Sequence, residues 1–159
     1  MAELNDLLVR GDSLLQGDAK INGKLNNHIL NTDDNVLVID VCRRLDVSVA
    51  NNSIMIDIPD GYVCTCILGG NQNVLGFTTY GSIPTSWTTN CSLQVSSVRA
   101  DTSAVETIDN DNIGNYGMGA INCNVPFFKG YLDIKVKTPC TGATKPYLTI
   151  YGQIICHKE

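Results

Sequence analysis

The sequence has little of what helical proteins are rich in. Only 3 of its 16 acidic residues are glutamate, and 7 alanines stand against 16 asparagines and 14 glycines. Glutamate and alanine favour helices, whereas asparagine, aspartate and glycine favour turns. The composition therefore excludes a mainly helical protein, and a hydrophobic content of 43% excludes intrinsic disorder.

Charge and long apolar runs are also scarce. Charged residues make up 17% of the 159 residues, and the net charge is −5. This negative charge argues against binding to nucleic acid, because proteins that bind nucleic acid present a basic face. The longest aliphatic run, residues 36–39, is far below the ~18 residues of a membrane span. Residues 1–6 show no basic and apolar leader pattern. We expect a protein made in a cytoplasm, without a signal peptide or membrane insertion.

The chain has seven cysteines. An odd number without a leader predicts reduced, buried thiols rather than a disulfide framework. Cys64 and Cys66 fall on one face of a predicted strand and therefore bring zinc into consideration, but they are not a C-x-x-C pair and no second close pair exists. We predict small core residues, no metal site and no cofactor.

Residues 8–25 form three units of six residues. Glycine recurs at Gly11, Gly17 and Gly23, and an aliphatic residue stands two places earlier, at Val9, Leu15 and Ile21. Glycine at this spacing would destabilise a helix by about 1 kcal/mol per site, so the repeat predicts short extended pieces joined by turns. Each unit offers one aliphatic residue, too few for a core. We therefore expect three identical chains to bury these aliphatic residues in a shared seam.

The run from Gly11 to Leu25 resembles the G-D-x-x-x-x-G-x-x-x-[IV]-x-G segments of bacteriophage fibre and spike proteins. Similar repeats also occur in bacterial surface adhesins. In the phage class a thin trimeric β-stalk carries a globular β-domain. The resemblance implies a trimeric stalk over residues 1–30, with the first residues anchored to other virion proteins.

Strand-like runs fill the rest of the chain, residues 31–159. Residues 36–42 form an apolar run interrupted only by Asp40, typical of a strand covered on both faces. Further runs are expected at 45–49, 54–58, 62–68, 74–80, 91–95, 132–136, 147–151 and 153–156. These eight or nine short strands predict an all-β fold, an antiparallel, jelly-roll-like β-sandwich. Residues 81–90 and 101–124 lack a strand pattern, and we expect loops there.

The expected loops hold the candidate binding residues. Trp87, the only tryptophan, lies among serine, threonine and asparagine, and sugars are commonly held by an aromatic face beside short polar side chains. Tyr80, Asn115 and Tyr116 would complete such a glycan site. The alternative is that Trp87 packs on the core or at a subunit contact. Residues 109–114 resemble the start of a calcium loop but lack the later ligands, so we expect a solvated turn.

Sequence motifs of catalysis are lacking: there is no nucleophile elbow, P-loop or dinucleotide fingerprint. We therefore expect no enzyme. The sequence predicts a virion structural protein: a small homotrimeric fibre, of head-fibre, capsid-decoration or short tail-fibre type, whose head attaches to host-surface glycan. The alternative is a non-viral carbohydrate-binding or lectin-like β-sandwich module in which the N-terminal repeat is an ordinary hairpin.

Overall fold

A computed structural model describes residues 35–79, 88–113, 117–125, 127–142 and 146–159. The predicted stalk residues lie outside these ranges: Val9, Gly11, Leu15, Gly17, Ile21 and Gly23. The stalk and its boundary near residue 30 therefore remain predictions. Within the described ranges the chain is all-β, and no helix there could cross a membrane.

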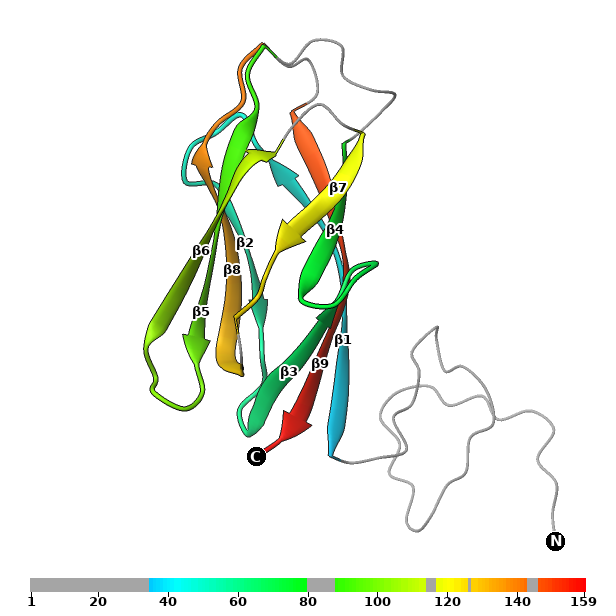
Figure 1. Cartoon of the computed structure of the whole chain (residues 1–159), viewed down its shortest axis with the longest axis vertical. Helices are drawn as coiled ribbons and strands as arrows, with labels where there is room; N and C mark the ends of the chain where they lie inside the picture. The colour runs from blue at the N-terminus through cyan, green and yellow to red at the C-terminus, as the bar shows by residue number, and fades with distance from the viewer. Residues whose placement is uncertain (1–34, 80–87, 114–116, 126, 143–145) are drawn as a thin grey trace, which may run out of the picture. The chain divides into compact units, whose positions relative to one another are not determined.

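Nine strands cover most of the described chain (Figure 1). They are β1 (Val36–Asp46), β2 (Ser53–Asp57), β3 (Tyr62–Leu68), β4 (Val74–Thr79), β5 (Cys91–Arg99), β6 (Val105–Ile113), β7 (Met118–Asn122), β8 (Phe128–Thr138) and β9 (Tyr147–Lys158). The alternating pattern predicted at residues 132–136 is confirmed, because Leu132, Ile134 and Val136 are all fully buried. Residues two apart on a strand share a face.

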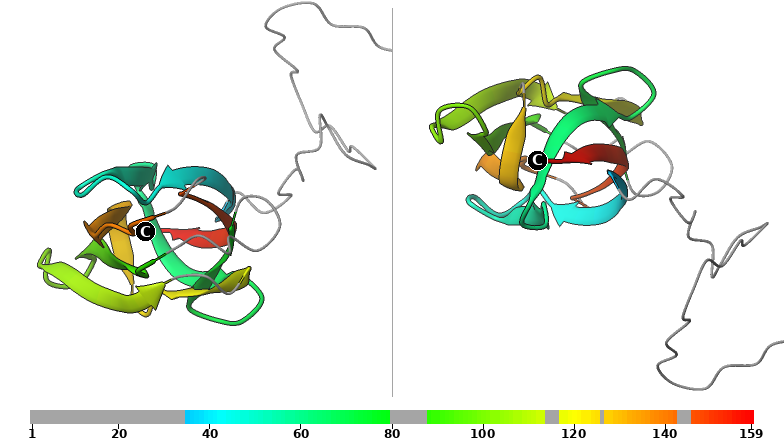
Figure 2. Two further views of the ribbon diagram at one scale, coloured as in Figure 1. Left: turned by 90° about the horizontal axis from the view of Figure 1, so that it is seen from above. Right: turned by 90° about the horizontal axis from the view of Figure 1, so that it is seen from below.

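The strands form one antiparallel sheet in the order β6-β5-β8-β3-β9-β4-β7, with β2 also on β8 and β1 also on β9. β3 joins the two halves, since it meets β8 only at the Cys64–Phe128 pair and otherwise pairs with β9. The sheet therefore folds into a β8 layer and a β9 layer. Seen end-on in Figure 2, the strands surround one interior. The expected all-β antiparallel fold is confirmed as a nearly closed sheet.

Two asparagine side chains bridge the openings between the layers. Asn110 Nδ2 donates to the carbonyl of Asn122 (3.1 Å), and Asn110 Oδ1 accepts from the Asn122 N–H (2.6 Å). This amide pairs β6 with β7 as a backbone peptide would. At the other edge, Asn52 Nδ2 donates to the carbonyl of Asp46 (2.9 Å), between the end of β1 and the start of β2.

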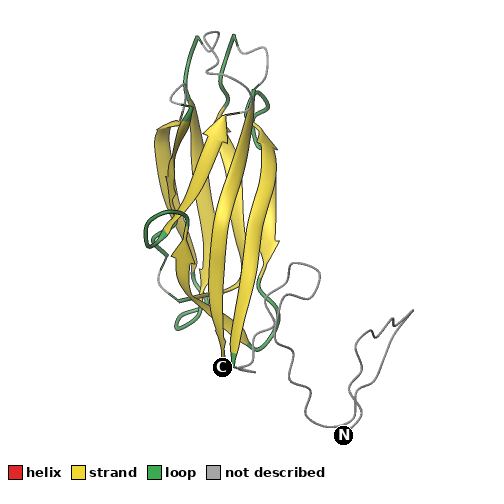
Figure 3. Cartoon of the chain, turned by 90° about the vertical axis from the view of Figure 1, so that its right-hand side faces the viewer, coloured by secondary structure: helices red, strands yellow, loops and turns green. Residues whose placement is uncertain are grey.

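One apolar core fills the space between the layers. Its largest fully buried side chains are Leu45, Val47, Ile67, Leu75, Leu93, Ile121, Phe128, Leu132, Ile134, Leu148, Ile150 and Ile154. They come from both layers. In Figure 3 the strands lie roughly along one axis and most of the connections gather at the two ends. Asn35 and Lys158 lie at the same end, joined by a backbone hydrogen bond of 2.8 Å.

The loop expected over residues 101–124 is wrong, because this segment contains β6 and β7. β6 has a polar sequence because most of its side chains face solvent, and its pairing with β5 defines it as a strand. Of the solvated turn expected at residues 109–114, residues 109–113 are instead the second half of β6, and residue 114 lies outside the described residues. β1 and β9 are single strands where the patterns predicted two each.

The strand at residues 36–42 is not covered on both faces by this chain, since Val38 is 38% exposed and Cys42 is also exposed. The cysteines are free thiols, and five are buried, as predicted: Cys64, Cys91, Cys123, Cys140 and Cys156. Cys64 and Cys66 do not share a face. A β-bulge between them lets Cys64 pair with buried Cys156 and Cys66 with outward-facing Ile155.

Candidate functional site

The glycan site predicted from the sequence lies outside the described residues. Its members are Tyr80, Trp87, Asn115 and Tyr116. The strand ends that flank these positions are neighbours: Thr79 N donates to the carbonyl of Gly117 (3.0 Å), and Cys91 pairs with Ile113. Both segments therefore leave the sheet at the end opposite Asn35, and the site itself stays a prediction.

Hollows open at both ends of the described sheet. The hollow near Asn35 measures about 400 Å³ and is lined by residues 58–62 and 129–131 with Val98 and Glu159. The hollow at the opposite end measures about 360 Å³ and is lined by Asn90, Cys91, Ser92, Asp111, Asn112 and Thr138. Among the non-glycine residues that line these two hollows, only Asn112 has a positive φ, and asparagine tolerates this left-handed conformation.

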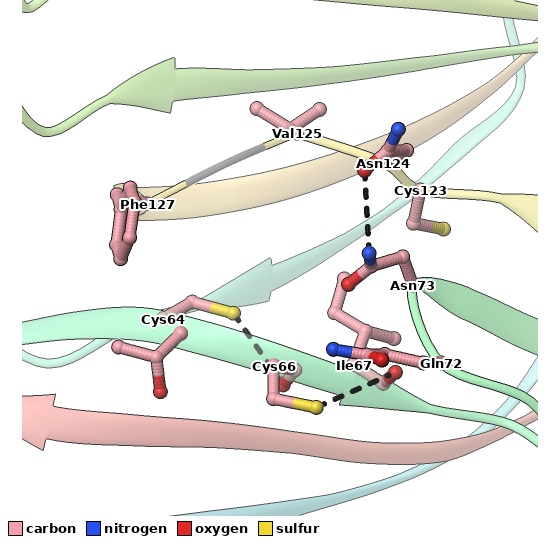
Figure 4. Close-up of a pocket in the computed structure, with 10 residues that line it drawn as sticks. Cys64, Cys66, Ile67, Gln72, Asn73, Cys123, Asn124, Val125 and Phe127 are labelled. Carbon is pink, nitrogen blue, oxygen red and sulfur yellow. Dashed lines mark hydrogen bonds between the residues drawn. The ribbon is translucent and has the colours of Figure 1, made fainter.

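A third hollow, the Phe127 pocket, lies on the side of the sheet and measures about 130 Å³ (Figure 4). It forms because β3 leaves β8 after Cys64, so that the next part of its edge faces the β7–β8 connection without a ladder. Its lining is Cys64, Thr65, Cys66, Ile67, Gln72, Asn73, Cys123, Asn124, Val125 and Phe127.

Phe127 lies at the rim of this pocket and has a strained backbone conformation. Its φ is 46°, and its side chain is 58% exposed, whereas the adjacent Phe128 is fully buried. A left-handed backbone costs a bulky residue about 1–2 kcal/mol. The carbonyl of Phe127 accepts a 2.6 Å hydrogen bond from Ala100 N, which fixes the backbone there. Strain of this kind gathers at functional sites, so an exposed, strained aromatic residue indicates binding.

Uncharged polar groups lie across the pocket from the Phe127 ring (Figure 4). Asn73 Nδ2 donates to Asn124 Oδ1 (3.3 Å), and the Asn73 carbonyl accepts from Cys123 N (2.9 Å). On β3, the hydroxyl of Thr65 hydrogen-bonds to His157 Nδ1 (2.7 Å). An aromatic face beside amides and a hydroxyl can recognise a neutral ligand that carries several hydroxyl groups.

Two thiols of the pocket, those of Cys64 and Cys123, are poor nucleophiles. Burial raises the pKa of Cys123 to about 12. A hydrogen bond with Cys156, followed by burial, raises the pKa of Cys64. These thiols are therefore protonated at neutral pH, whereas the thiolate is the reactive form. Among the described residues, no group of three or more His, Cys, Asp or Glu side chains could hold a metal ion. The pocket is suited to binding.

Sequence reasoning missed this pocket because its residues come from three separate segments. One signal was present: Phe127 and Phe128 are adjacent. Neighbouring residues of an extended chain point to opposite sides, so only one of two adjacent phenylalanines could enter the core.

The chain matches no protein-family model, and no curated protein is significantly similar to it. Its fold and pockets are therefore the basis for any functional assignment. The described residues define an all-β protein with a small aromatic and amide-lined pocket.

Proposed function

We propose that the chain is a small homotrimeric fibre protein of a bacteriophage particle, of head-fibre, decoration or short tail-fibre type. The supporting observation is the order of its parts: three glycine hexads at residues 8–25, then an all-β head that begins at Val36. Each hexad carries one aliphatic residue, which it cannot bury alone. The described residues form an apolar core, and under this proposal the aliphatic residues of the hexads pack between partner chains.

The head attaches the particle to a neutral glycan of the host surface. Phe127 offers an exposed ring, and Gln72, Asn73 and Asn124 offer amides around a space of about 130 Å³. This space suits a single sugar ring better than a folded partner, which would need a larger contact surface. Other virion proteins would bind the first residues of the chain.

Sedimentation and native mass measurement test the trimer. The full chain of 17.2 kDa should sediment at three times its own mass, and deletion of residues 1–25 should weaken the trimer. A lectin-like module would instead stay folded and keep its oligomeric state after the deletion. A full chain that is monomeric at all concentrations refutes the fibre.

Binding to immobilised glycans tests the site. Phe127→Asn should abolish binding yet leave the fold intact, because asparagine tolerates a left-handed backbone. Met118→Ala is the matched control, since Met118 is 70% exposed and lies away from the pocket lining. If Trp87→Ala abolishes binding and Phe127→Asn does not, the glycan binds at the tryptophan segment. If the wild-type chain retains no glycan, attachment uses another ligand.

A further inference from the structure

The β9 layer presents apolar side chains on its outer side. Six residues form this apolar face: Val38, Cys42, Cys66, Leu68, Tyr151 and Ile155. The strand register makes them neighbours, because Ile155 pairs with both Val38 and Cys66, and Cys42 pairs with Tyr151. Leu68 and Tyr151 are each 39% exposed, and Val38 is 38% exposed.

These positions should be polar if water covered them. An antiparallel sheet with one solvated side alternates apolar residues inside with polar residues outside. β1 instead begins with an unbroken run of four aliphatic residues, 36–39, so its first two outward positions, 36 and 38, are apolar as well. Exposed apolar surface of this kind, crossed here only by the hydrogen-bonded pair Asp40 and Gln153, indicates an interaction site.

The other layer shows what the solvated side of this protein looks like. The four ion pairs found in the described residues join Arg99 with Asp101 and Glu106, Lys135 with Asp133, and Lys137 with Asp109. These residues belong to β5, β6, β8 and the β5–β6 turn. These four ion pairs therefore lie on the β8 layer, whereas Val38, Leu68 and Tyr151 are exposed on the β9 layer.

Charge also favours the apolar face as a contact between copies. Each chain has a net charge of −5, so two copies repel each other on average. On β1, Cys42 lies between Asp40 and Arg44, which have opposite charges, and the Asp40 carboxylate accepts a 2.9 Å hydrogen bond from Gln153. Two such faces can meet without adding like charge.

The chain enters the head beside this face. Residues 1–34 join the described part at Asn35, and β1 begins at the next residue. Chains held together through residues 8–25 would bring their β1 strands together at high effective concentration. We infer that the apolar face is the surface on which the heads of neighbouring copies pack. This inference rests on the proposed trimer and names the surface that the heads use.

Cys42 reports on this contact in the native chain, because it is an exposed thiol of the face. In the trimeric wild type, a maleimide should label Cys42 at least about tenfold more slowly than in the variant Val38→Lys/Leu68→Lys, because labelling of the wild type requires opening of the contact between heads. Met55→Lys/Val105→Lys is the matched control: both residues are more than half exposed and lie on β2 and β6. Cys42 should stay protected there.

The outcomes separate the two proposals. A trimer whose Cys42 labels equally fast in the wild type and in Val38→Lys/Leu68→Lys refutes the apolar face and leaves the fibre standing. A monomeric full chain refutes the trimer itself. Loss of protection in the control variant as well also refutes the inference. If Val38→Lys/Leu68→Lys does not fold, the wild type is diluted instead. Cys42 must then become accessible to the maleimide as the trimer dissociates, and protection that persists in the monomer refutes the inference.

Discussion

Replacement of Asn110 by alanine should weaken the closure of the sheet. The side chain is 8% exposed and makes two hydrogen bonds to the backbone of Asn122. Each hydrogen bond contributes roughly 0.5–1.5 kcal/mol net, and a donor or acceptor left unpaired costs more where water cannot reach it. We therefore expect Asn110→Ala to lower the free energy of unfolding by about 2–3 kcal/mol.

Urea unfolding at one fixed protein concentration measures this loss, because the stability of an oligomer depends on concentration. Thr107→Ala is the matched control, since Thr107 is an exposed residue of the same strand; it should change stability by less than ~0.5 kcal/mol. Hydrogen exchange in Asn110→Ala should accelerate in β7 more than in β5. Equal losses in the two variants, or equal acceleration in both strands, would show that Asn110 does not hold the layers together.

Three further changes test other parts of the structure. Gly69→Ala should lower the free energy of unfolding, measured by heat or urea, by on the order of 3 kcal/mol, because its Cβ would collide with the backbone at Gly76 N and, at 2.6 Å, with Leu75 Cα. Gly61 has open space around it and a φ of 81°, so Gly61→Ala should cost only about 1 kcal/mol. Equal costs for the two variants would contradict the packing argument. Burial raises the pKa of Cys123 from 9.0 to about 12, so the stabilising contribution of the protonated thiol is complete below pH 9 and declines as the pH rises towards 12. Between pH 9 and 10 the free energy of unfolding should fall by about 1 kcal/mol more in the wild type than in Cys123→Ala. Parallel pH profiles of the two proteins would refute this. Phe127→Asn should raise the free energy of unfolding by about 1 kcal/mol, and a destabilised variant would show that the φ of 46° is not a source of strain.

The strands that the sequence revealed are those with one buried and one solvated side. β8 is the clearest case, because Leu132, Ile134 and Val136 alternate with polar residues. β6 could not be found in this way, because pairing with β5 rather than burial makes it a strand. Strand pairing depends on distant residues, and no local pattern contains it.

The candidate pocket was hidden for a related reason. Its polar residues, Gln72, Asn73 and Asn124, stand in connections that sequence alone treats as turns. Asparagine generally favours turns, yet Asn52 and Asn110 bridge strand edges with their side chains. An amide can replace a peptide group in a ladder because it offers the same donor and acceptor, and residue type does not say which use a given asparagine has.

The low charge of the chain and its apolar face have one explanation under the proposed assembly. Surface strands usually place charged residues on their outward positions, and the β8 layer does so with Lys135 and Lys137. The β9 layer has Val38, Tyr151 and Ile155 at equivalent outward positions. If identical heads pack on these residues, charges there would lose their hydration without gaining partners, at a cost that increases with burial. Selection for assembly would then favour apolar residues at these three positions, while Asp40 and Arg44, of opposite charge, stay beside them on β1.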